Sequence, residues 1–208
     1  ALGTGGIRGD NGEGIVRGAL ARGVTYLDAA PDYSGSGSEQ AIGRALDEAE
    51  RRGTPVRSAL DLPCGTGRLA PLVFERSIAT TGADVSLEML YEAFRKLGKK
   101  FPILQCSADA IPLRDGSLDA VFAIRFLFHL DRGGRAAVLK EMARVSRRWV
   151  ILDVRHRYNL RWVGWRIRHA LGLLPQVQHR FSRAGLEQEL SGAGLALLDR
   201  DLRYDPLN

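Results

Sequence analysis

Residues 59–70, "ALDLPCGTGRLA", constrain the fold of this chain more than any other stretch. The apolar run from Ala59 to Leu62 is typical of a buried strand, and the glycines that follow it are typical of a turn that opens a helix. A strand–turn–helix unit of this kind brings backbone N–H groups close to a bound nucleotide. The stretch therefore predicts an α/β fold with a nucleotide-binding loop, and it leaves open which nucleotide is bound.

The pattern after residue 58 repeats this alternation of strands and helices. Each predicted strand is a short apolar run, and each predicted helix has apolar residues at helical spacing. The predicted strands are residues 58–63, 78–86, 101–107, 117–126, 148–155 and 195–203, and the predicted helices are residues 67–76, 87–100, 132–147 and 182–194. Alternation of this kind predicts a Rossmann-like, mostly parallel sheet that is covered by helices on both faces.

The composition is that of a globular protein. The chain has 208 residues, of which 45% are hydrophobic and 26% charged, and it has no apolar run long enough to span a membrane. Its two cysteines do not form a disulfide framework and lack metal-ligand spacing, so we predict a cytoplasmic protein without a metal site. The start is neither a Met nor a signal peptide, which indicates a processed chain, a fragment or a fusion.

The first 57 residues form a different pattern. Residues 11–23 and 39–53 are predicted helices, and "VTYLDAA" is a predicted strand, so the segment reads as β-α-β-α. Residues 2–52 resemble the opening units of aldo-keto reductases, and this resemblance implies a catalytic role for Asp28 and Tyr33. The expected catalytic Lys and six further units of the barrel are missing. We therefore predict an incomplete appendage and keep a nicotinamide-dependent reductase as the alternative function.

Three motifs in residues 58–203 resemble those of class I S-adenosylmethionine-dependent methyltransferases. They are "DLPCGTG" from Asp61, "GADVSLEML" around Asp84 and "SADAIPLRDGS" from Ser107. The first motif also fits the dinucleotide fingerprint G-x-G-x-x-G/A, but the order and spacing of all three favour S-adenosylmethionine. We therefore predict a methyltransferase domain over residues 58–208, without the last strand that such domains normally have.

The resemblance implies a cofactor site on the loops after the first four strands. Asp84 would accept hydrogen bonds from the ribose hydroxyls, and Ser107 would contact the adenine edge. Pro63 replaces the usual first glycine of the motif, whereas Gly65 and Gly67 are retained. The expected cofactor-binding residues are Asp61, Cys64, Gly65, Thr66, Gly67, Asp84, Val85, Met89, Ser107, Ala108, Asp109 and Arg125.

Methyl transfer from a sulfonium requires alignment of the reacting atoms, and it needs a base only when the acceptor is protonated. His129, which follows the fourth strand, is the candidate base, and a packed histidine beside Phe126 and Phe128 is the competing interpretation. Asp153, at the end of the fifth strand, is a further candidate for the acceptor side. The sequence contains no other group of residues in a pattern typical of a catalytic site.

Residues 154–183 connect the fifth strand to the last helix and are rich in arginine and tryptophan without an acidic residue. Such a segment suits a small-molecule or lipid-like acceptor and peripheral contact with a membrane. It would also attract nucleic acid, which we do not expect as the partner, and a solvated basic lid is the simplest interpretation. A third hypothesis is a chain that binds the cofactor but transfers no methyl group.

Overall fold

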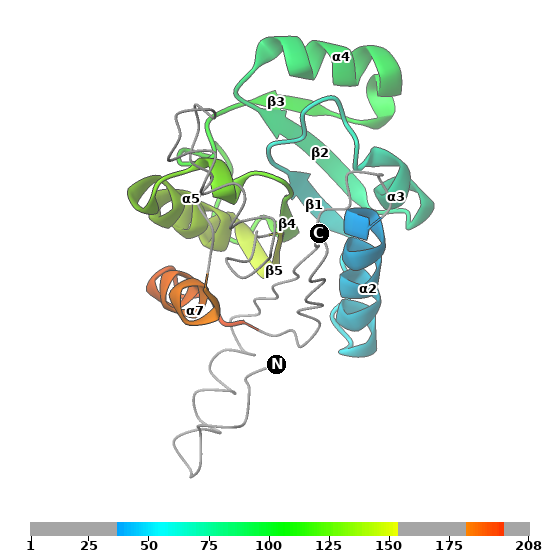
Figure 1. The fold of residues 1–208 in the computed structure, drawn as a ribbon. Coiled ribbons are helices and arrows are strands. Elements are labelled where there is room, and N and C mark those ends of the chain that lie inside the picture. Colours follow the sequence, from blue (N-terminus) through cyan, green and yellow to red (C-terminus); the bar gives the residue numbers. More distant parts are fainter. Residues whose placement is uncertain (1–36, 154–181, 198–208) are drawn as a thin grey trace.

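The computed structural model describes residues 37–153 and 182–197 of the chain. Its centre is a five-stranded sheet with the order β3-β2-β1-β4-β5, in which every neighbouring pair is parallel (Figure 1). The strands are β1 Ser58–Asp61, β2 Ala79–Asp84, β3 Ile103–Gln105, β4 Leu118–Ala123 and β5 Ser146–Leu152. The predicted parallel α/β sheet is therefore confirmed. The strands predicted near residues 24–30 and 195–203 lie wholly or mostly outside the described residues.

Helices cover both faces of the sheet. They are α2 Gly37–Arg51, α3 Ala70–Glu75, α4 Leu87–Leu97, α5 Arg132–Val145 and α7 Arg183–Gly192. Figure 1 shows α2 and α3 on one side of the sheet and α5 and α7 on the other, with α4 over β2 and β3. Helix α3 connects β1 to β2, α4 connects β2 to β3 and α5 connects β4 to β5, which is the usual connection between parallel neighbours, whereas residues 106–117 lead from β3 to β4 without a helix.

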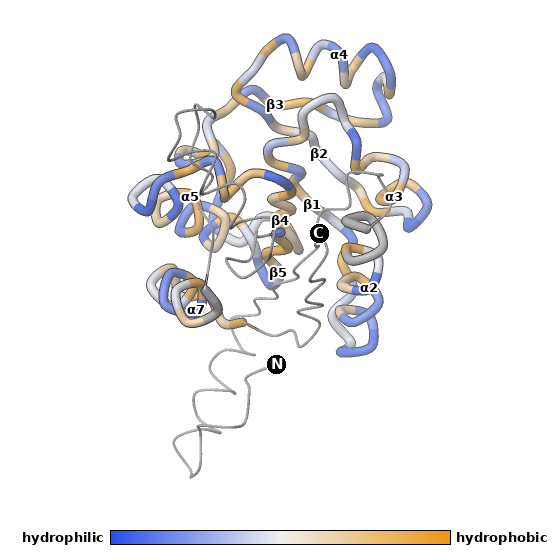
Figure 2. The backbone as a smooth tube through the Cα atoms, in the orientation of Figure 1, coloured by the Kyte–Doolittle hydropathy of each residue, from blue (hydrophilic) through white to orange (hydrophobic). Residues whose placement is uncertain are grey.

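The strands have two apolar faces, which explains why they read as continuous apolar runs. In β4, Ala120 and Phe122 pack with α2 and α3, whereas Val121 and Ala123 pack with α5 and α7. The same alternation of faces continues in β5. Figure 2 shows hydrophobic residues along the central strands and hydrophilic residues on the outer helices. This distribution is expected for a parallel sheet that is buried on both faces.

Helix α2 belongs to the same hydrophobic core as the sheet, although it precedes the domain boundary predicted at residue 57. Ile42, Ala45, Leu46 and Ala49 are all at most 6% exposed and pack in one cluster with β1, β4 and β5. A boundary between residues 57 and 58 stays a prediction. The structure shows that the helix predicted over residues 39–53 is α2 and covers one face of the sheet.

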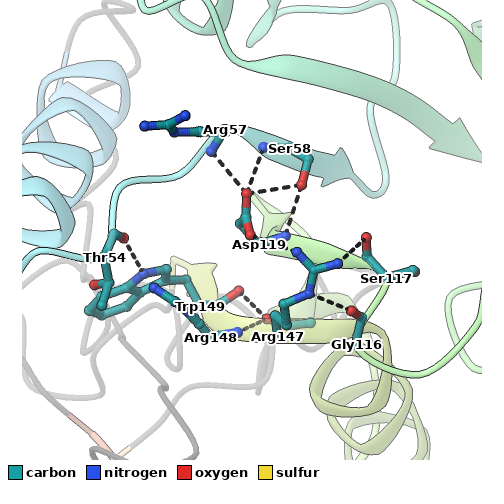
Figure 3. Close-up of polar contacts among 10 residues, drawn as sticks. Thr54, Arg57, Ser58, Gly116, Ser117, Asp119, Arg147, Arg148 and Trp149 are labelled. Carbon is teal, nitrogen blue, oxygen red and sulfur yellow. Dashed lines mark hydrogen bonds and ion pairs between the residues drawn. The ribbon is translucent and has the colours of Figure 1, made fainter.

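The amino-terminal edge of the sheet is closed by a polar network (Figure 3). Asp119 Oδ2 accepts hydrogen bonds from the backbone N–H groups of Arg57 and Ser58 at 3.1 Å and from the Ser58 hydroxyl at 3.0 Å. Burial would raise the pKa of Asp119, but these hydrogen bonds and the nearby Arg147 hold it below its ordinary value. Trp149 Nε1 donates to the carbonyl of Thr54 at 3.0 Å, which ties β5 to the segment that leaves α2.

Several predicted helix boundaries are wrong by one to three residues, and two of these differences have a clear physical reason. The helix predicted from residue 67 starts at Ala70, because Gly67 has a φ of +76° in the turn. The helix predicted to end at residue 147 ends at Val145, because Ser146 is extended and begins β5. In contrast, α4 begins as expected, since the Ser86 hydroxyl accepts a hydrogen bond from Met89 N as an N-cap.

Replacement of Glu189 by Ala is expected to lower the free energy of unfolding by about 3 kcal/mol, because it removes a buried carboxylate that accepts two hydrogen bonds from Arg135. Arg135 of α5 donates two hydrogen bonds of 2.7 Å to Glu189 of α7, and the two side chains are only 9% and 11% exposed. Glu92→Ala is the matched control, since Glu92 also pairs with an arginine, Arg95, at 2.8 Å but on the surface. Urea unfolding measures both variants, and equal losses would contradict a role for the buried pair.

Candidate functional site

The carboxyl ends of β1 and β2 hold the first two motifs beside each other. Cys64 N donates to the carbonyl of Ala83 at 2.8 Å, and Gly65 N donates to Asp84 Oδ2 at 2.9 Å. The glycine-rich loop that follows β1 is therefore fixed to the end of β2. In an open α/β sheet, a ligand binds at this edge, where the connections from the central strand leave in opposite directions. Here that strand is β1, which lies between β2 and β4.

The two glycines of the loop have different physical reasons to be glycine. Both have positive φ angles, +52° at Gly65 and +76° at Gly67. A Cβ atom on Gly67 would lie 2.4 Å from Leu97 Cδ1, so this glycine allows α4 to pack closely against the loop. A Cβ atom on Gly65 would have no protein atom within 4 Å. The surface over Gly65 is therefore open to a ligand that approaches the backbone.

Asp84 organises the loops around it. Its side chain is only 7% exposed, and Oδ1 accepts a hydrogen bond from Ser86 N at 3.0 Å while Oδ2 accepts the one from Gly65 N. A carboxylate oxygen has two lone pairs, so each oxygen can accept one further hydrogen bond. Asp84 can therefore accept hydrogen bonds from two hydroxyl groups, as expected for a ribose-binding residue. At the same time, its hydrogen bond with Gly65 N holds the glycine-rich loop in place.

Large apolar side chains are exposed directly after Asp84. Val85 is 69% exposed, Leu87 59% and Met89 45%, at the start of α4. Exposed apolar side chains that gather on one short stretch often mark a binding surface. Val85 and Met89 were predicted as cofactor contacts, and their exposure beside a carboxylate and an open glycine fits a ligand with a flat apolar base and a ribose.

The loop after β3 carries the third motif. The Ser107 hydroxyl donates a hydrogen bond to Asp109 Oδ1, and Ala108 is only 8% exposed. Cys106 N donates to the carbonyl of Asp84 at 3.2 Å, so this loop begins beside the end of β2. The structure therefore brings the loops of all three motifs to one edge of the sheet.

An arginine–glutamate pair on α5 braces the end of this third motif, and the sequence interpretation missed it. Glu141 Oε2 accepts from Ile111 N at 2.9 Å, and Arg144 donates to the carbonyls of Ile111 at 2.8 Å and Leu113 at 2.7 Å. The hydrogen bonds from Arg144 hold the pKa of Glu141 below its ordinary value. The only sequence signal is the helical spacing of the two charges, which does not indicate a distant loop as their partner.

The end of β4 carries the candidates for the acceptor side. Arg125 has a positive φ of 59°, which is unusual for a residue with a side chain, and its N–H donates to Asp153 Oδ1. Asp153 is only 2% exposed at the end of β5. His129 is exposed in the short helix Leu127–His129, and its ring centroid lies 4.4 Å from that of Phe128. A catalytic role for His129 and a cofactor contact for Arg125 stay predictions.

The carboxyl group of Asp61 has a strongly raised pKa. Asp61 ends β1 and is only 2% exposed, and no hydrogen bond or ion pair among the described residues involves its carboxyl group. Burial and, second, the negative charge of Asp84 raise its pKa to about 8. Burial, Asp61 and Asp84 also raise the pKa of Cys64, to about 12. Strong perturbation of this kind is common in functional sites.

Some predicted features lie outside the described residues or have no described contact. Asp28 and Tyr33, and residues 154–181 of the basic connection, are not described. Thr66 lies between the two glycines of the loop and is partly exposed. In the part of the chain that the structure describes, no cluster of His, Cys, Asp or Glu could hold a metal, and no helix is long and apolar enough to cross a membrane.

The described fold is that of S-adenosylmethionine-dependent methyltransferases. A structure of magnesium protoporphyrin IX methyltransferase from Synechocystis with bound S-adenosylhomocysteine has a TM-score of 0.63 at 17% identity, and the alignment covers 96% of this chain and 91% of that chain. A methyltransferase from Methanosarcina mazei has a TM-score of 0.57 at 20% identity and covers 65% of this chain and 78% of that one.

Residues 60–151 match the model of a methyltransferase domain family, and the match runs from within β1 to within β5 and includes the three motifs. An uncharacterized methyltransferase of Mycobacterium bovis is 35% identical over 92 residues, which are 44% of this chain and 36% of that protein. The chain thus spans about a third of that relative's length. The resemblance of residues 58–203 to methyltransferases is supported over the matched segment. These comparisons give no support to an aldo-keto-reductase segment in residues 2–52.

Asp61→Asn is expected to remove a pH dependence of stability. Because the pKa of Asp61 is about 8 in the folded protein and near 3.8 otherwise, the unfolded chain loses this proton first as the pH rises. Between pH 5 and pH 8 the wild-type protein should therefore lose on the order of 3 kcal/mol of unfolding free energy, at about 1.4 kcal/mol for each pKa unit.

Urea unfolding at pH 5 and pH 8 measures this loss. Asp61→Asn should show little of it, whereas Asp47→Asn, which changes an exposed carboxylate paired with Arg76 at 3.1 Å, should retain it. The groups Asp119 and Glu141 do not interfere, because their lowered pKa values place their titration below this window. If the unfolding free energy of the wild type and of Asp61→Asn depended equally on pH, this result would contradict the raised pKa of Asp61.

Proposed function

We propose that this chain carries a methyltransferase that uses S-adenosylmethionine to methylate a small-molecule or lipid-like acceptor. The observation that carries the proposal is the hydrogen bond of 2.9 Å from Gly65 N to Asp84 Oδ2. It joins the glycine-rich loop to the acid after β2 at the switch point of the sheet. The family match over residues 60–151 supports the same reading.

The proposed cofactor site uses four neighbouring loops. Backbone groups of Gly65 and Gly67 approach the amino-acid end of the cofactor, and Asp84 accepts from the two ribose hydroxyls. Val85 and Met89 cover the faces of the adenine, which their exposure of 69% and 45% allows. The remaining contacts come from the residues that flank these groups, namely Asp61, Cys64, Thr66, Ser107, Ala108, Asp109 and Arg125.

S-adenosylmethionine supplies an electrophilic methyl group when it is bound. The chain's own task is to hold the cofactor and the acceptor in line and to exclude water. The residues after β4, together with Asp153 at the end of β5, would form the acceptor side, where Asp153 fixes the unusual backbone of Arg125 through the hydrogen bond from Arg125 N. His129 follows in the same loop and would take the proton from an acceptor that carries one.

The acceptor class rests on the basic connection of residues 154–183. Its arginines and its tryptophans suit an acceptor that combines an apolar body with a negative charge. Most of this connection lies outside the described residues, so the acceptor class is inferred from composition alone. Contact of this segment with a membrane surface belongs to the same proposal.

Calorimetric titration of the full chain with S-adenosylhomocysteine and, separately, with NADPH tests the proposed function. We expect saturable binding of S-adenosylhomocysteine alone. Asp84→Ala should weaken it at least tenfold, because the variant removes the ribose acceptor and the bond to Gly65 N. Asp47→Ala, an exposed acid on α2, is the control.

The same titration also tests the two other hypotheses, a nicotinamide-dependent reductase and a chain that binds the cofactor without methyl transfer. Binding of NADPH alone would contradict the proposal and favour the reductase alternative at Asp28 and Tyr33. Binding of S-adenosylhomocysteine without methyl transfer to any acceptor in a subsequent screen would favour an inactive cofactor-binding chain.

Gly65→Ala should weaken binding of S-adenosylhomocysteine at least tenfold, because the new methyl group would stand where the cofactor approaches the loop. Gly53→Ala is a matched control: both glycines have positive φ, +52° and +70°, and neither has a protein atom within 4 Å of an added Cβ. Each variant should therefore lose about 1 kcal/mol of stability from backbone strain. Equal cofactor affinity in the two variants would argue against a site over Gly65.

A further inference from the structure

The exposed large apolar side chains of the described residues gather in one part of the structure. Those that are at least 36% exposed are Phe74, Val85, Leu87, Met89, Tyr91, Phe94 and Ile103. All of them except Phe74 belong to α4, to the turn that begins it or to β3, which α4 contacts. The proposed cofactor would cover Val85 and Met89, and it leaves the other four unexplained. A concentration of this kind marks an interaction surface.

Leu87, Tyr91 and Phe94 form a stripe along α4. They are 59%, 69% and 43% exposed, and their spacing of four and three residues places them on one side of the helix. A different side is buried and contains Leu90 and Ala93. Helix α4 therefore has one apolar side that packs on the protein and a second apolar side that faces solvent, where a surface helix normally carries polar residues.

Ile103 of β3 lies on the face of the sheet that α4 covers. It is paired in register with Gly82 of β2, so the two residues belong to the same face. A Cβ atom on Gly82 would meet Phe101 and Cys64, which pack in one cluster with Leu90 of α4. Strand β3 is at the edge of the sheet, with α4 as the outer helix beside it (Figure 1). The exposed apolar residues of α4 and β3 are therefore on one side of the molecule.

Positive charge borders these apolar residues. Glu92 of α4 pairs with Arg95 at 2.8 Å, and Glu88 Oε2 accepts a hydrogen bond from the Ser86 hydroxyl at 2.8 Å, so both acids of the helix have partners. None of the ion pairs among the described residues involves the exposed lysines at the end of α4 and just after it, which are Lys96, Lys99 and Lys100. This unbalanced charge favours an anionic partner.

An anionic membrane fits this surface better than a strand of another protein or a second copy does. Strand β3 has only three residues, and Pro102 before it has no N–H, so it offers little backbone to an added strand. Two copies that met here would bring their lysines together, which repulsion between like charges disfavours. In contrast, leucine and aromatic side chains beside lysines on a surface helix are typical of a segment that lies in the headgroup region of a membrane.

We propose that this surface docks the protein on membranes that contain anionic lipid. The apolar side chains enter the boundary between headgroups and acyl chains, and the lysines contact the headgroup phosphates. Because α4 begins shortly after Asp84, docking brings the proposed cofactor site to the membrane, where a lipid-like acceptor is within reach. Only this last consequence rests on the proposed function. We call the surface the α4 surface, and its residues are Leu87, Tyr91, Phe94, Ile103, Lys96, Lys99 and Lys100.

Sedimentation of the full chain with lipid vesicles tests this inference. One set of vesicles contains phosphatidylcholine and phosphatidylglycerol in equal parts, and the other contains phosphatidylcholine alone. The wild type should bind the anionic vesicles at least tenfold more tightly than the neutral ones, because each lysine near an anionic surface adds to the attraction. Binding to the anionic vesicles should weaken as the salt concentration rises, since salt screens exposed charges.

Two variants locate the contact. The double variant Leu87→Ser/Tyr91→Ser and the triple variant Lys96→Gln/Lys99→Gln/Lys100→Gln should each bind the anionic vesicles at least tenfold more weakly than the wild type. Both should keep the wild-type affinity for S-adenosylhomocysteine. The changed side chains are exposed, so little packing is lost, and circular dichroism checks the fold. The matched control is Lys140→Gln, which changes an exposed lysine of α5 and should bind as the wild type does.

Three results would overturn the inference. The wild type does not bind the anionic vesicles, or either variant binds them as tightly as the wild type, which would assign the contact to another segment such as residues 154–183. The third is self-association of the lipid-free wild type in analytical ultracentrifugation that Leu87→Ser/Tyr91→Ser abolishes, which would make the α4 surface an interface between copies. Failure to bind S-adenosylhomocysteine would instead overturn the proposed function and leave the docking intact.

Discussion

The carboxylate of Asp84 is the interaction on which the candidate site depends. One side chain accepts hydrogen bonds from Gly65 N at 2.9 Å and from Ser86 N at 3.0 Å, so it fixes the glycine-rich loop after β1 and the turn that begins α4. Because the acid itself is buried, both bonds are shielded from water and are stronger than they would be on the surface. The open surface over Gly65 and the exposed Val85 keep their positions through this one residue.

Two aspartates at opposite edges of the sheet differ in their hydrogen bonds and in the direction of their pKa shifts. At the amino-terminal edge, Asp119 accepts from Arg57 N, Ser58 N and the Ser58 hydroxyl, and its pKa is low. At the carboxyl edge, Asp61 is more deeply buried than Asp119, and its pKa is raised to about 8 by burial and by Asp84. Stability explains the first arrangement, because a buried polar group is normally paired. The second is a cost to the folded protein that a bound ligand would offset.

The sequence predicted the sheet and the three loops because both follow from local signals. Apolar runs between glycines specify buried strands, and the motif order places Asp61, Asp84 and Ser107 after consecutive strands. Parallel strands end at one edge, so their loops had to meet. The structure confirms that arrangement, including the N-cap at Ser86.

Contacts between distant segments could not be predicted in the same way. The bracing of Ile111 by Glu141 and the packing of α2 on the sheet join residues whose sequence spacing carries no information about each other. The hydrogen bond from Arg125 N to Asp153 depends on a positive φ that nothing in the residue type indicates. Such features arise from the packing of the whole fold, which local patterns do not encode.

Hydrogen–deuterium exchange of the full chain with and without S-adenosylhomocysteine tests the central claim most directly. If the cofactor binds over the loop that Asp84 fixes, the amides of residues 64–68 and 85–90 should exchange more slowly in its presence. The amides at the opposite edge, around residues 115–118, should be unchanged. Protection elsewhere in the chain, with none at the glycine-rich loop, would contradict the account.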